Sequence, residues 1–235
     1  MVIIMKNLTG KVAVITGAGG GMGCEIAKLL ADAGVKLALL SNDTASLDAL
    51  ASTLRGEFIT LACDVRDEAA VGTAFAETVR VLGKPDILLN LAGLSIPAKI
   101  WEMDEASYDL SIDVNVKGTF LCSKHFANCC AEDAQIINIG SMAAKRANPN
   151  APLYCTAKAA VNMLSAAMQM QFKDRGIRVT TLNPGGADTG FWGDRPVKRE
   201  KLLKASDVAE VMLFVLTRES RVAFSEINFE SFLML

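Results

Sequence analysis

Residues 11–34 read KVAVITGAGGGMGCEIAKLLADAG. This stretch has the pattern of a strand, a glycine loop and a helix, and it indicates the fold class of the whole chain. Its first six residues form an aliphatic run typical of a buried strand, and from residue 22 onward apolar residues recur at helical spacing. Between them lie Gly17, Gly21 and Gly23, in the pattern GxxxGxG. Such a loop brings backbone N–H groups and a helix N-terminus close to a phosphate, where a Cβ would obstruct the approach. Glycines also form ordinary turns, but a strand before the loop and a helix after it favour a nucleotide site.

The same alternation of short aliphatic runs and longer amphipathic segments continues to the end of the chain. Near-continuous apolar strands that alternate with helices are typical of a parallel sheet covered on both faces. We therefore predict an α/β fold: a single Rossmann-type doubly wound domain over residues 1–235, with about seven parallel strands. We expect strands at 11–16, 36–40, 58–62, 86–90, 135–140, 177–183 and 226–230, and helices near 22–33, 44–54, 67–82, 105–130, 153–174 and 206–217.

Composition excludes several classes of partner. Of the 235 residues 51% are hydrophobic, and the net charge is −2, so nothing favours nucleic acid or an anionic membrane surface. No run reaches the ~18 apolar residues of a membrane span. The opening MVIIM is too short for a signal-peptide core; it is either an early start codon ahead of Met5 or an edge strand. Six scattered cysteines without a CxxC pattern indicate reduced thiols and a cytoplasmic protein.

One group of side chains has the spacing of a metal site. Cys122, His125 and Cys129 fall at i, i+3 and i+7 of a helical pattern and share one face. Zinc would require a fourth ligand from another segment. Because free cysteine is commonly buried as a small apolar residue, we interpret the group as part of a buried or interface helix and expect no metal.

The residues at the carboxyl ends of the strands carry the chemistry, because ligands bind there in an open parallel sheet. The glycine loop with its threonine reads TGxxxGxG, and residues 154–158 read YCTAK, with Tyr154 and Lys158 one helical turn apart. Further along the chain are CDV with Asp64, NLAG at 90–93, VNVKGTF with Asn115, GSMAA with Ser141 and NPGGADT at 183–189. Together these motifs resemble the short-chain dehydrogenase/reductase superfamily over essentially the whole chain. One departure is Leu91, where the family's NNAG motif has a second Asn.

The resemblance implies an NAD(P)-dependent oxidoreductase that moves a hydride between the nicotinamide and a ketone or secondary alcohol. Tyr154 would be the acid/base. A free tyrosine has a pKa of about 10, and a cation one turn away favours phenolate. The resemblance also assigns Lys158 a bond to the nicotinamide ribose, Ser141 the substrate oxygen, and Asn115 a water that links Lys158 to solvent. Each of these residues also has a purely structural interpretation. Tyr154 and Lys158 would then be a surface pair, Ser141 a helix or turn cap, and Asn115 a buried amide that bonds the backbone.

The same comparison supplies the expected cofactor contacts. They come from the glycine loop, the ends of the second to fourth strands, the acid/base pair and the 183–189 segment. The residues are Thr16, Gly17, Gly21, Met22, Gly23, Ser41, Asn42, Asp64, Val65, Asn90, Ala92, Gly93, Tyr154, Lys158, Pro184, Gly185, Ala187 and Thr189.

The residue after the second strand distinguishes the two cofactors, because an acid there bonds the ribose 2′-hydroxyl of NAD and an Arg accommodates the 2′-phosphate of NADP. By family spacing Ser41 occupies the position where NAD-preferring members carry Asp, and Asn42 the position where NADP-preferring members often carry Arg. The sequence therefore has neither the acidic nor the basic residue that would identify the cofactor. Asp43 either serves the ribose or caps the following helix. The neutral donors Ser41, Asn42 and Thr44 shift our expectation slightly toward NADP, with NAD as the alternative.

We expect the substrate to be a small carbonyl or alcohol compound that binds in an apolar pocket. Fold analogy alone does not identify it further. Residues 190–204 are a candidate lid. Lys99, Lys145, Arg146 and Arg195 would meet an acidic substrate, or they belong to solvated loops. The expected pocket residues are Leu94, Ile96, Ala143, Phe191 and Trp192.

The chain ends in FSEINFESFLML, without the Gly-rich ending common in the family. Its apolar residues, with the small and apolar faces of helices 105–130 and 153–174, predict a homotetramer or, alternatively, a homodimer. A different class of function is a non-catalytic dinucleotide-sensing regulator on the same fold, although such proteins typically lose the Tyr or the Lys. An epimerase or dehydratase would require a C-terminal substrate domain beyond these 235 residues.

Overall fold

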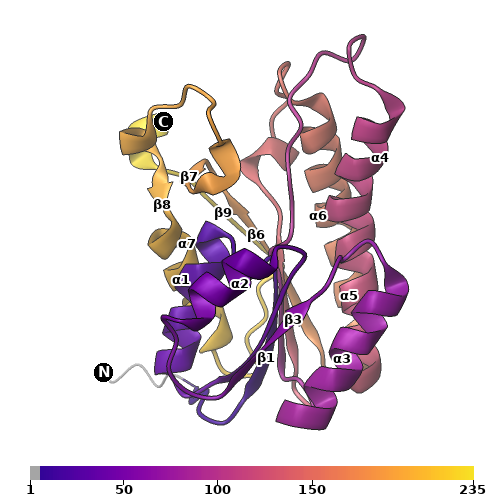
Figure 1. Cartoon of the computed structure of the whole chain (residues 1–235), viewed down its shortest axis with the longest axis vertical. Helices are drawn as coiled ribbons and strands as arrows, with labels where there is room; N and C mark the ends of the chain where they lie inside the picture. The colour runs from indigo at the N-terminus through magenta and orange to yellow at the C-terminus, as the bar shows by residue number, and fades with distance from the viewer. Residues whose placement is uncertain (1–5) are drawn as a thin grey trace.

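The computed structural model describes residues 6–235, so both readings of MVIIM, as an early start or as an edge strand, lie outside the described residues. Within these residues, seven parallel strands form the central sheet in the order β3-β2-β1-β4-β5-β6-β9. The sheet runs through the middle of the molecule (Figure 1). The predicted α/β fold with a seven-stranded parallel sheet is therefore confirmed. The strands are β1 (Val12–Thr16), β2 (Lys36–Ser41), β3 (Phe58–Ala62), β4 (Ile87–Asn90), β5 (Gln135–Ile139), β6 (Arg178–Pro184) and β9 (Glu226–Phe229).

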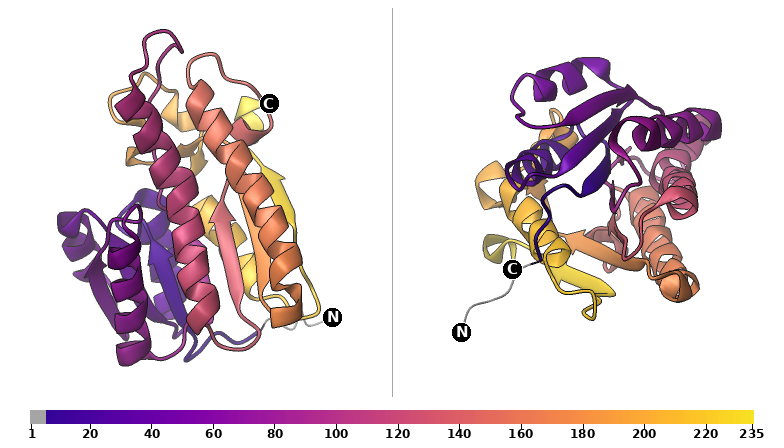
Figure 2. Two further views of the ribbon diagram at one scale, coloured as in Figure 1. Left: turned by 90° about the vertical axis from the view of Figure 1, so that its right-hand side faces the viewer. Right: turned by 90° about the horizontal axis from the view of Figure 1, so that it is seen from below.

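Helices cover both faces of the sheet, as Figure 2 shows from the side and from below. Successive side chains of a strand point to opposite faces: in β1, Ala13 and Ile15 join one apolar core, and Val12 and Val14 join the other. The first core packs under α1 (Gly21–Asp32), α2 (Thr44–Ala51) and α7 (Ala205–Leu216), and the second under α3 (Glu68–Leu82), α5 (Gly118–Cys129) and α6 (Pro152–Phe172). None of the helices within residues 6–235 has the length and apolarity to cross a bilayer.

The helix expected over 105–130 is interrupted, which corrects the sequence prediction. It consists of α4 (Glu105–Ile112), a π-helical turn at Asp113–Lys117, and α5. A π turn inserts one extra residue into a helix and is frequent at functional sites. Here it carries Asn115, which is fully buried.

Two strands of two residues each, β7 (Ala187–Asp188) and β8 (Leu203–Lys204), form a second small sheet that was not expected. They lie at the carboxyl edge of the main sheet, near the C-terminus (Figure 1). The candidate lid, residues 190–204, runs between them. Arg199 ties it to β7, with its Nη1 2.5 Å from Asp188 Oδ1.

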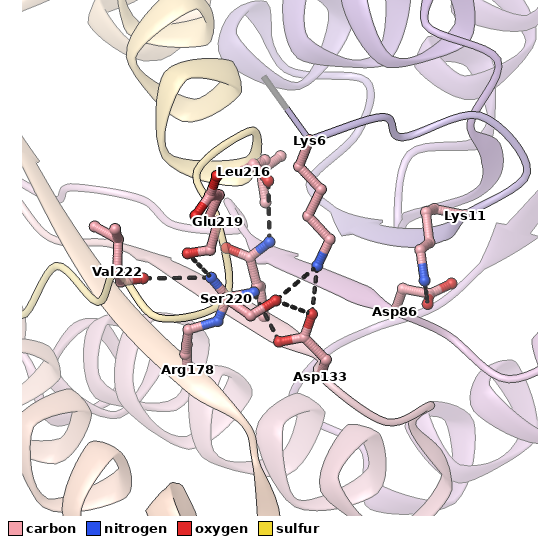
Figure 3. A network of polar contacts seen from close by, with 10 residues as sticks. Lys6, Lys11, Asp86, Asp133, Arg178, Leu216, Glu219, Ser220 and Val222 are labelled. Carbon is pink, nitrogen blue, oxygen red and sulfur yellow. Dashed lines mark hydrogen bonds and ion pairs between the residues drawn. The ribbon is translucent and has the colours of Figure 1, made fainter. Parts of the chain in front are cut away.

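A polar network closes the opposite, amino-terminal edge of the sheet (Figure 3). The Asp133 carboxylate accepts hydrogen bonds from Lys6 and Ser220, and Arg178 Nη2 lies 3.1 Å from its other oxygen. Burial raises the pKa of Asp133, but the bonds from Lys6 and Ser220 and the charge of Arg178 outweigh this and hold it below its usual range. The network joins the chain before β1 to the starts of β5 and β6 and to the end of α7.

Asp133→Asn is expected to lower stability by about 0.5–1 kcal/mol, because the pairs are partly exposed and solvent screens them. For a domain of this size that corresponds to a melting temperature lower by about 2 °C. Because the folded-state pKa is depressed, the contribution is complete above the unfolded value of about 3.9 and is lost as the pH falls through the folded-state pKa. Thermal unfolding at pH 7 and below pH 4 measures both effects. Glu132→Gln, a change at an exposed neighbour that forms no ion pair within residues 6–235, is the control; equal shifts for the two variants would contradict the account.

Candidate active site

A cavity of about 480 Å³ opens at the carboxyl edge of the sheet. Its wall is built from the segments that follow β1, β4, β5 and β6, from the start of α6 and from the end of the chain. This is where the parallel topology predicts ligands to bind. Among the sequence-predicted residues in the wall are Met22, Gly93, Ser141, Tyr154, Lys158 and Thr189.

Tyr154 and Lys158 lie in the first two turns of α6, which begins at Pro152. Proline is favoured at this position because the first helical N–H has no partner within the helix. Lys158 is 3% exposed, and its Nζ donates a 2.9 Å hydrogen bond to the Ile139 carbonyl at the end of β5. The same Nζ lies 5.7 Å from the centre of the Tyr154 ring. The pair is therefore part of the cavity wall rather than an exposed helix pair.

The electrostatics of this pair differ from the expectation. Burial raises the pKa of Tyr154 to about 12; the Ser141 hydroxyl and the charge of Arg195 lower it, but by less. Desolvation by burial lowers the pKa of Lys158 to about 8. The cavity disfavours both charged forms, so the protein alone does not produce the acidic phenol that a cation one turn away was expected to give.

Ser141 follows β5 and serves as a turn cap as well as a cavity residue. Its backbone N–H donates to Asn183 Oδ1 at 2.9 Å, and its Oγ accepts the N–H of Ala143 at 3.0 Å. Asn183 in turn donates to Asn228 on β9. A row of amides across β6 and β9 thus fixes the backbone that presents Ser141 to the cavity.

The side-chain amide of Asn115 is hydrogen-bonded through its nitrogen but not through its oxygen within the described residues. Its Nδ2 donates to the carbonyls of Leu94 and Ser111, both at 2.9 Å. Its Oδ1 is buried without a hydrogen-bond partner within the described residues. A Cβ at Gly93 would meet this oxygen at 2.8 Å and Lys158 Nζ at 3.2 Å. Because buried polar atoms are nearly always bonded, an acceptor left open beside a lysine is a place for a bridging water.

The glycine loop has the geometry of a phosphate cradle. Gly17 adopts φ +63°, and a Cβ there would lie 2.9 Å from the Ala92 backbone, so a side chain is excluded on both counts. A Cβ at Gly23 would lie 2.5 Å from the Gly17 carbonyl. The N-terminus of α1 has no side-chain cap, whereas Asp43, Asp67 and Asp104 cap α2, α3 and α4. The free N–H groups of α1 therefore remain available to an anion.

Two of the expected cofactor residues, Thr16 and Asn90, are buried and connect the ends of neighbouring strands and helices. Thr16 is 1% exposed, and its Oγ1 accepts the N–H groups of Leu91 and Ala92, which joins the ends of β1 and β4. Asn90 is 3% exposed and donates to Ser123 on α5 and Asn138 on β5.

The far end of the site lies beyond β2 and β3. Ser41 Oγ accepts the N–H of Asp43, and the Asp43 carboxylate accepts the N–H of Ser46 as the cap of α2, which was one of its two predicted roles. Asn42 is exposed. After β3, the Asp64 carboxylate is bound by the Arg66 guanidinium, which holds the pKa of Asp64 below its usual range. The next residue, Val65, is buried, and a Cβ at Gly118 would meet its Cγ2 at 2.6 Å.

The segment after β6 borders the cavity on the side of α1. Pro184, Gly185, Ala187 and Thr189 all lie in the wall. A Cβ on Gly21 would meet Thr189 Cγ2 at 2.8 Å, so this segment closes directly over the glycine loop.

The expected substrate residues divide into two sets. Ala143, Phe191 and Trp192 lie in the cavity wall, and the Tyr154 and Phe191 rings are 5.5 Å apart. Leu94 and Ile96 are not in the wall. The wall residues of this segment are Leu91, Gly93 and Ser95, at alternate positions as in an extended chain.

Met142, Arg146 and Asn148 also lie in the wall, and Arg146 was among the cations expected to meet the substrate; three further wall residues were not predicted: Glu230, Ser231 and Met234. The last three belong to the C-terminal segment, which the sequence analysis assigned to subunit packing. They could have been predicted from the parallel direction of β9. Its carboxyl end must lie at the same edge of the sheet as the carboxyl ends of β5 and β6, so the residues that follow β9 lie near the cavity.

The cysteine–histidine group on α5 is only partly in the core, since His125 and Cys129 are half-buried. Cys122 is fully buried, and His125 stacks on Phe75 with ring centres 6.2 Å apart. Within residues 6–235 no group of three or more His, Cys, Asp or Glu side chains has the geometry of a metal site.

An uncapped helix after a glycine loop, at the carboxyl edge of a parallel sheet, defines the class of Rossmann-type nucleotide-binding proteins. A sequence model of the family described as "short chain dehydrogenase" matches residues 11–200. The chain belongs to this family and is one of its oxidoreductases, and members of the family bind NAD(P).

Individual relatives agree with this assignment. An uncharacterised oxidoreductase of Staphylococcus saprophyticus is 33% identical over 230 residues, which cover 95% of this chain and 98% of the relative. A short-chain dehydrogenase from Burkholderia cenocepacia, solved in complex with NADP, is 26% identical with a TM-score of 0.88, over 98% of this chain and 100% of the other. The 3-ketoacyl-(acyl-carrier-protein) reductase of Brucella melitensis, solved with NADH, is 29% identical with a TM-score of 0.85, over 94% and 98%.

Proposed function

We propose that the protein reduces a ketone to a secondary alcohol, or catalyses the reverse oxidation, with NAD(P) as hydride donor or acceptor and Tyr154 as the acid/base. The observation that carries this proposal is the convergence of Tyr154, Ser141 and Lys158 on one cavity that also borders the glycine loop. The cofactor supplies the hydride when it is bound; the protein must bind and orient the carbonyl and supply the proton.

Tyr154 would be the proton donor when a carbonyl is reduced. Burial raises its pKa to about 12, so the phenol carries its proton near neutrality. The Ser141 hydroxyl, in the same wall, donates a second hydrogen bond that orients the carbonyl oxygen and stabilises the charge that develops on it. In the oxidative direction the Tyr154 oxygen, as phenolate, would take the proton from the alcohol.

The proton that Tyr154 gives up must be replaced. Lys158 Nζ and the open Asn115 Oδ1 both lie beside Gly93, and a water between them would connect the buried lysine to solvent. We therefore assign Asn115 the role of anchoring that water. Its own position is fixed by the π turn and by two carbonyl bonds.

Four groups of residues would hold the cofactor. The glycine loop, with Gly17, Gly21, Met22 and Gly23, and the N-terminus of α1 would take the pyrophosphate. Ser41, Asn42, Asp64 and Val65 would surround the adenosine, and Ala92, Gly93, Tyr154 and Lys158 the nicotinamide ribose. Pro184, Gly185, Ala187 and Thr189 would hold the nicotinamide, and the buried Thr16 and Asn90 would keep these loops in place.

We propose NADP as the preferred cofactor because the two carboxylates described at the adenosine end are engaged within the protein: Asp43 caps α2, and Asp64 is bound by Arg66. Ser41→Asp is expected to reverse this preference toward NAD by about 10-fold or more, because a carboxylate bonds the 2′-hydroxyl and repels a 2′-phosphate. Fluorescence titration with NADPH and NADH, in the wild type and the variant, measures the change. Tighter NADH binding by the wild type would contradict the preference for NADP.

The substrate we propose is a small ketone that fits an apolar wall of Ala143, Phe191 and Trp192, in the manner of a carbonyl reductase or of a reductase acting on 3-oxoacyl compounds, like the Brucella enzyme. We also propose a homotetramer, with a homodimer as the alternative. Large apolar side chains on α5 and α6 support it: Phe120 is 46%, Met163 72% and Met170 81% exposed in the single chain.

The experiment that tests the function is consumption of NADPH and NADH over a panel of ketones, 3-oxoacyl thioesters, sugars and oxo acids. Turnover of at least one carbonyl compound is expected. Tight cofactor binding without turnover of any of them would favour a dinucleotide sensor instead.

A further inference from the structure

Charged side chains around the cavity divide into paired and unpaired groups. Of the four cations that the sequence places at its mouth, Lys145 is bound to Glu226 at 2.8 Å and Arg146 to Glu230 at 2.6 Å. Lys99 donates to Pro149 O and Asn150 Oδ1 on a neighbouring loop. Lys145 and Arg146 therefore have acidic partners, whereas Lys99 is bound by neutral groups and lies outside the cavity wall.

Arg195 is different. It lies in the cavity wall and forms no ion pair with any acid in residues 6–235, including its neighbour Asp194. Its Nε donates to the Trp192 carbonyl at 2.8 Å, and its Nη2 donates to the Phe191 carbonyl. These bonds restrain the guanidinium but leave its positive charge without a counter-charge.

Two aromatic rings pack against this guanidinium. Its central carbon lies 4.9 Å from the centre of the Phe191 ring and 5.0 Å from that of Trp192, and the two rings are perpendicular. Trp192 is itself fixed by a 2.8 Å bond from its Nε1 to the Ala187 carbonyl. A guanidinium held by two carbonyls and two rings is preorganised, so little side-chain entropy is lost when it binds an anion.

This fixed charge acts on the reacting end of the cavity. Phe191 packs against both the guanidinium and the Tyr154 ring. The charge of Arg195 also acts to lower the pKa of Tyr154, although burial raises it by more. Lys158, the other unpaired cation in the wall, is buried beside the phenol and is bound to Ile139. Arg195 is therefore the cation that a substrate can meet away from the reacting carbonyl.

We propose that Arg195 binds a carboxylate of the substrate, so that the preferred substrates are oxo acids and the products hydroxy acids. This inference rests on the proposed function, because it extends the same cavity from Tyr154 toward Arg195. Guanidinium and carboxylate form short, charge-assisted hydrogen bonds, and the aromatic walls suit an apolar group next to the acid.

The kinetic test compares acids with their neutral esters. The probes are phenylglyoxylate and 3-benzoylpropanoate, each against its methyl ester. For at least one pair we expect the wild type to prefer the acid, and Arg195→Gln to lower kcat/KM for that acid by about 10- to 100-fold. The matching ester should change by less than about 3-fold, and Arg195→Lys should restore part of the loss because it keeps the charge without the planar fork.

A double variant controls for charge in general. Arg146→Gln with Glu230→Gln removes a pair that carries no net charge from the same wall, so the acid-to-ester ratio should stay within about 3-fold of the wild type. Equal losses for acid and ester in Arg195→Gln would show that Arg195 only holds the Phe191 and Trp192 carbonyls in place, and the inference would be wrong. Wild-type turnover of the esters without any preference for either acid would overturn the inference and leave the proposed function intact.

A binding measurement gives a readout independent of turnover. The chain has two tryptophans, and Trp192 touches Arg195, so in a Trp101→Phe background the fluorescence of Trp192 reports occupancy beside the guanidinium. We expect the unreactive 3-phenylpropanoate to bind at least about 10-fold more tightly than its methyl ester, and this difference to disappear in Arg195→Gln. Equal affinities for acid and ester would refute the proposed carboxylate site even if no substrate for turnover is found.

Discussion

Tyr154→Phe is expected to lower kcat by about 10²- to 10⁴-fold, the range that general acid–base catalysis contributes. The substitution removes one oxygen from the cavity wall and leaves the ring, with its contact to Phe191, in place. The loss should therefore appear in turnover, while the affinity for NAD(P)H stays within about 2-fold. Steady-state kinetics and a fluorescence titration of the same preparation measure the two quantities.

A matched substitution shows whether this loss is specific. Tyr108→Phe removes the hydroxyl of the chain's other tyrosine, which is 48% exposed on α4 and outside the cavity wall. Its kinetics should equal those of the wild type. Near-normal turnover in Tyr154→Phe would remove Tyr154 from the mechanism.

Lys158→Met is expected to affect both turnover and cofactor binding, which distinguishes it from Tyr154→Phe. Loss of a charge-assisted bond to the ribose should weaken NAD(P)H binding by about 10- to 100-fold, and loss of the charge beside the phenol should lower kcat by about 10²-fold or more. The same two measurements test it. An unchanged cofactor affinity would contradict the second role of Lys158.

Stability and pH dependence separate a functional Lys158 from a structural one. The side chain is buried and makes a single hydrogen bond, so replacing it with an apolar residue of similar length should not lower the melting temperature. Because burial lowers the pKa of Lys158 to about 8, its charge is present below that pH and is lost above it. Cofactor affinity should therefore weaken as the pH rises through about 8 in the wild type but not in Lys158→Met.

Much of the fold was predictable because it follows from local patterns. The runs at 11–16, 58–62 and 135–140 are rich in aliphatic residues, and their strands begin and end within a residue of the expected bounds. The π turn at Asp113–Lys117 was not predictable, since one extra residue in a helix leaves the hydrophobic spacing around it almost unchanged. β7 and β8 have two residues each, too few for any periodicity to show.

The candidate site was predictable as far as it depends on strand ends and short motifs. The glycine loop, Ser141, Tyr154 and Lys158 border one cavity, as their positions in the sequence suggested. The direction of the pKa shift of Tyr154 was not predictable, because it depends on how deeply the phenol is buried. The pairing of Arg146 with Glu230, 84 residues apart, could not be found from the sequence either, and it is what singles out Arg195 as unpaired.

The most direct test of the account is the fate of the transferred hydrogen. A ketone from the substrate panel is reduced with NAD(P)H that carries deuterium at the transferable position, and the product alcohol is analysed by mass spectrometry. We predict one deuterium on the carbinol carbon with the wild type and almost no labelled product with Tyr154→Phe at equal cofactor occupancy. Cofactor consumption without deuterium in the alcohol, or equal labelling by Tyr154→Phe, would contradict the claim that this cavity performs hydride transfer with Tyr154 as its acid.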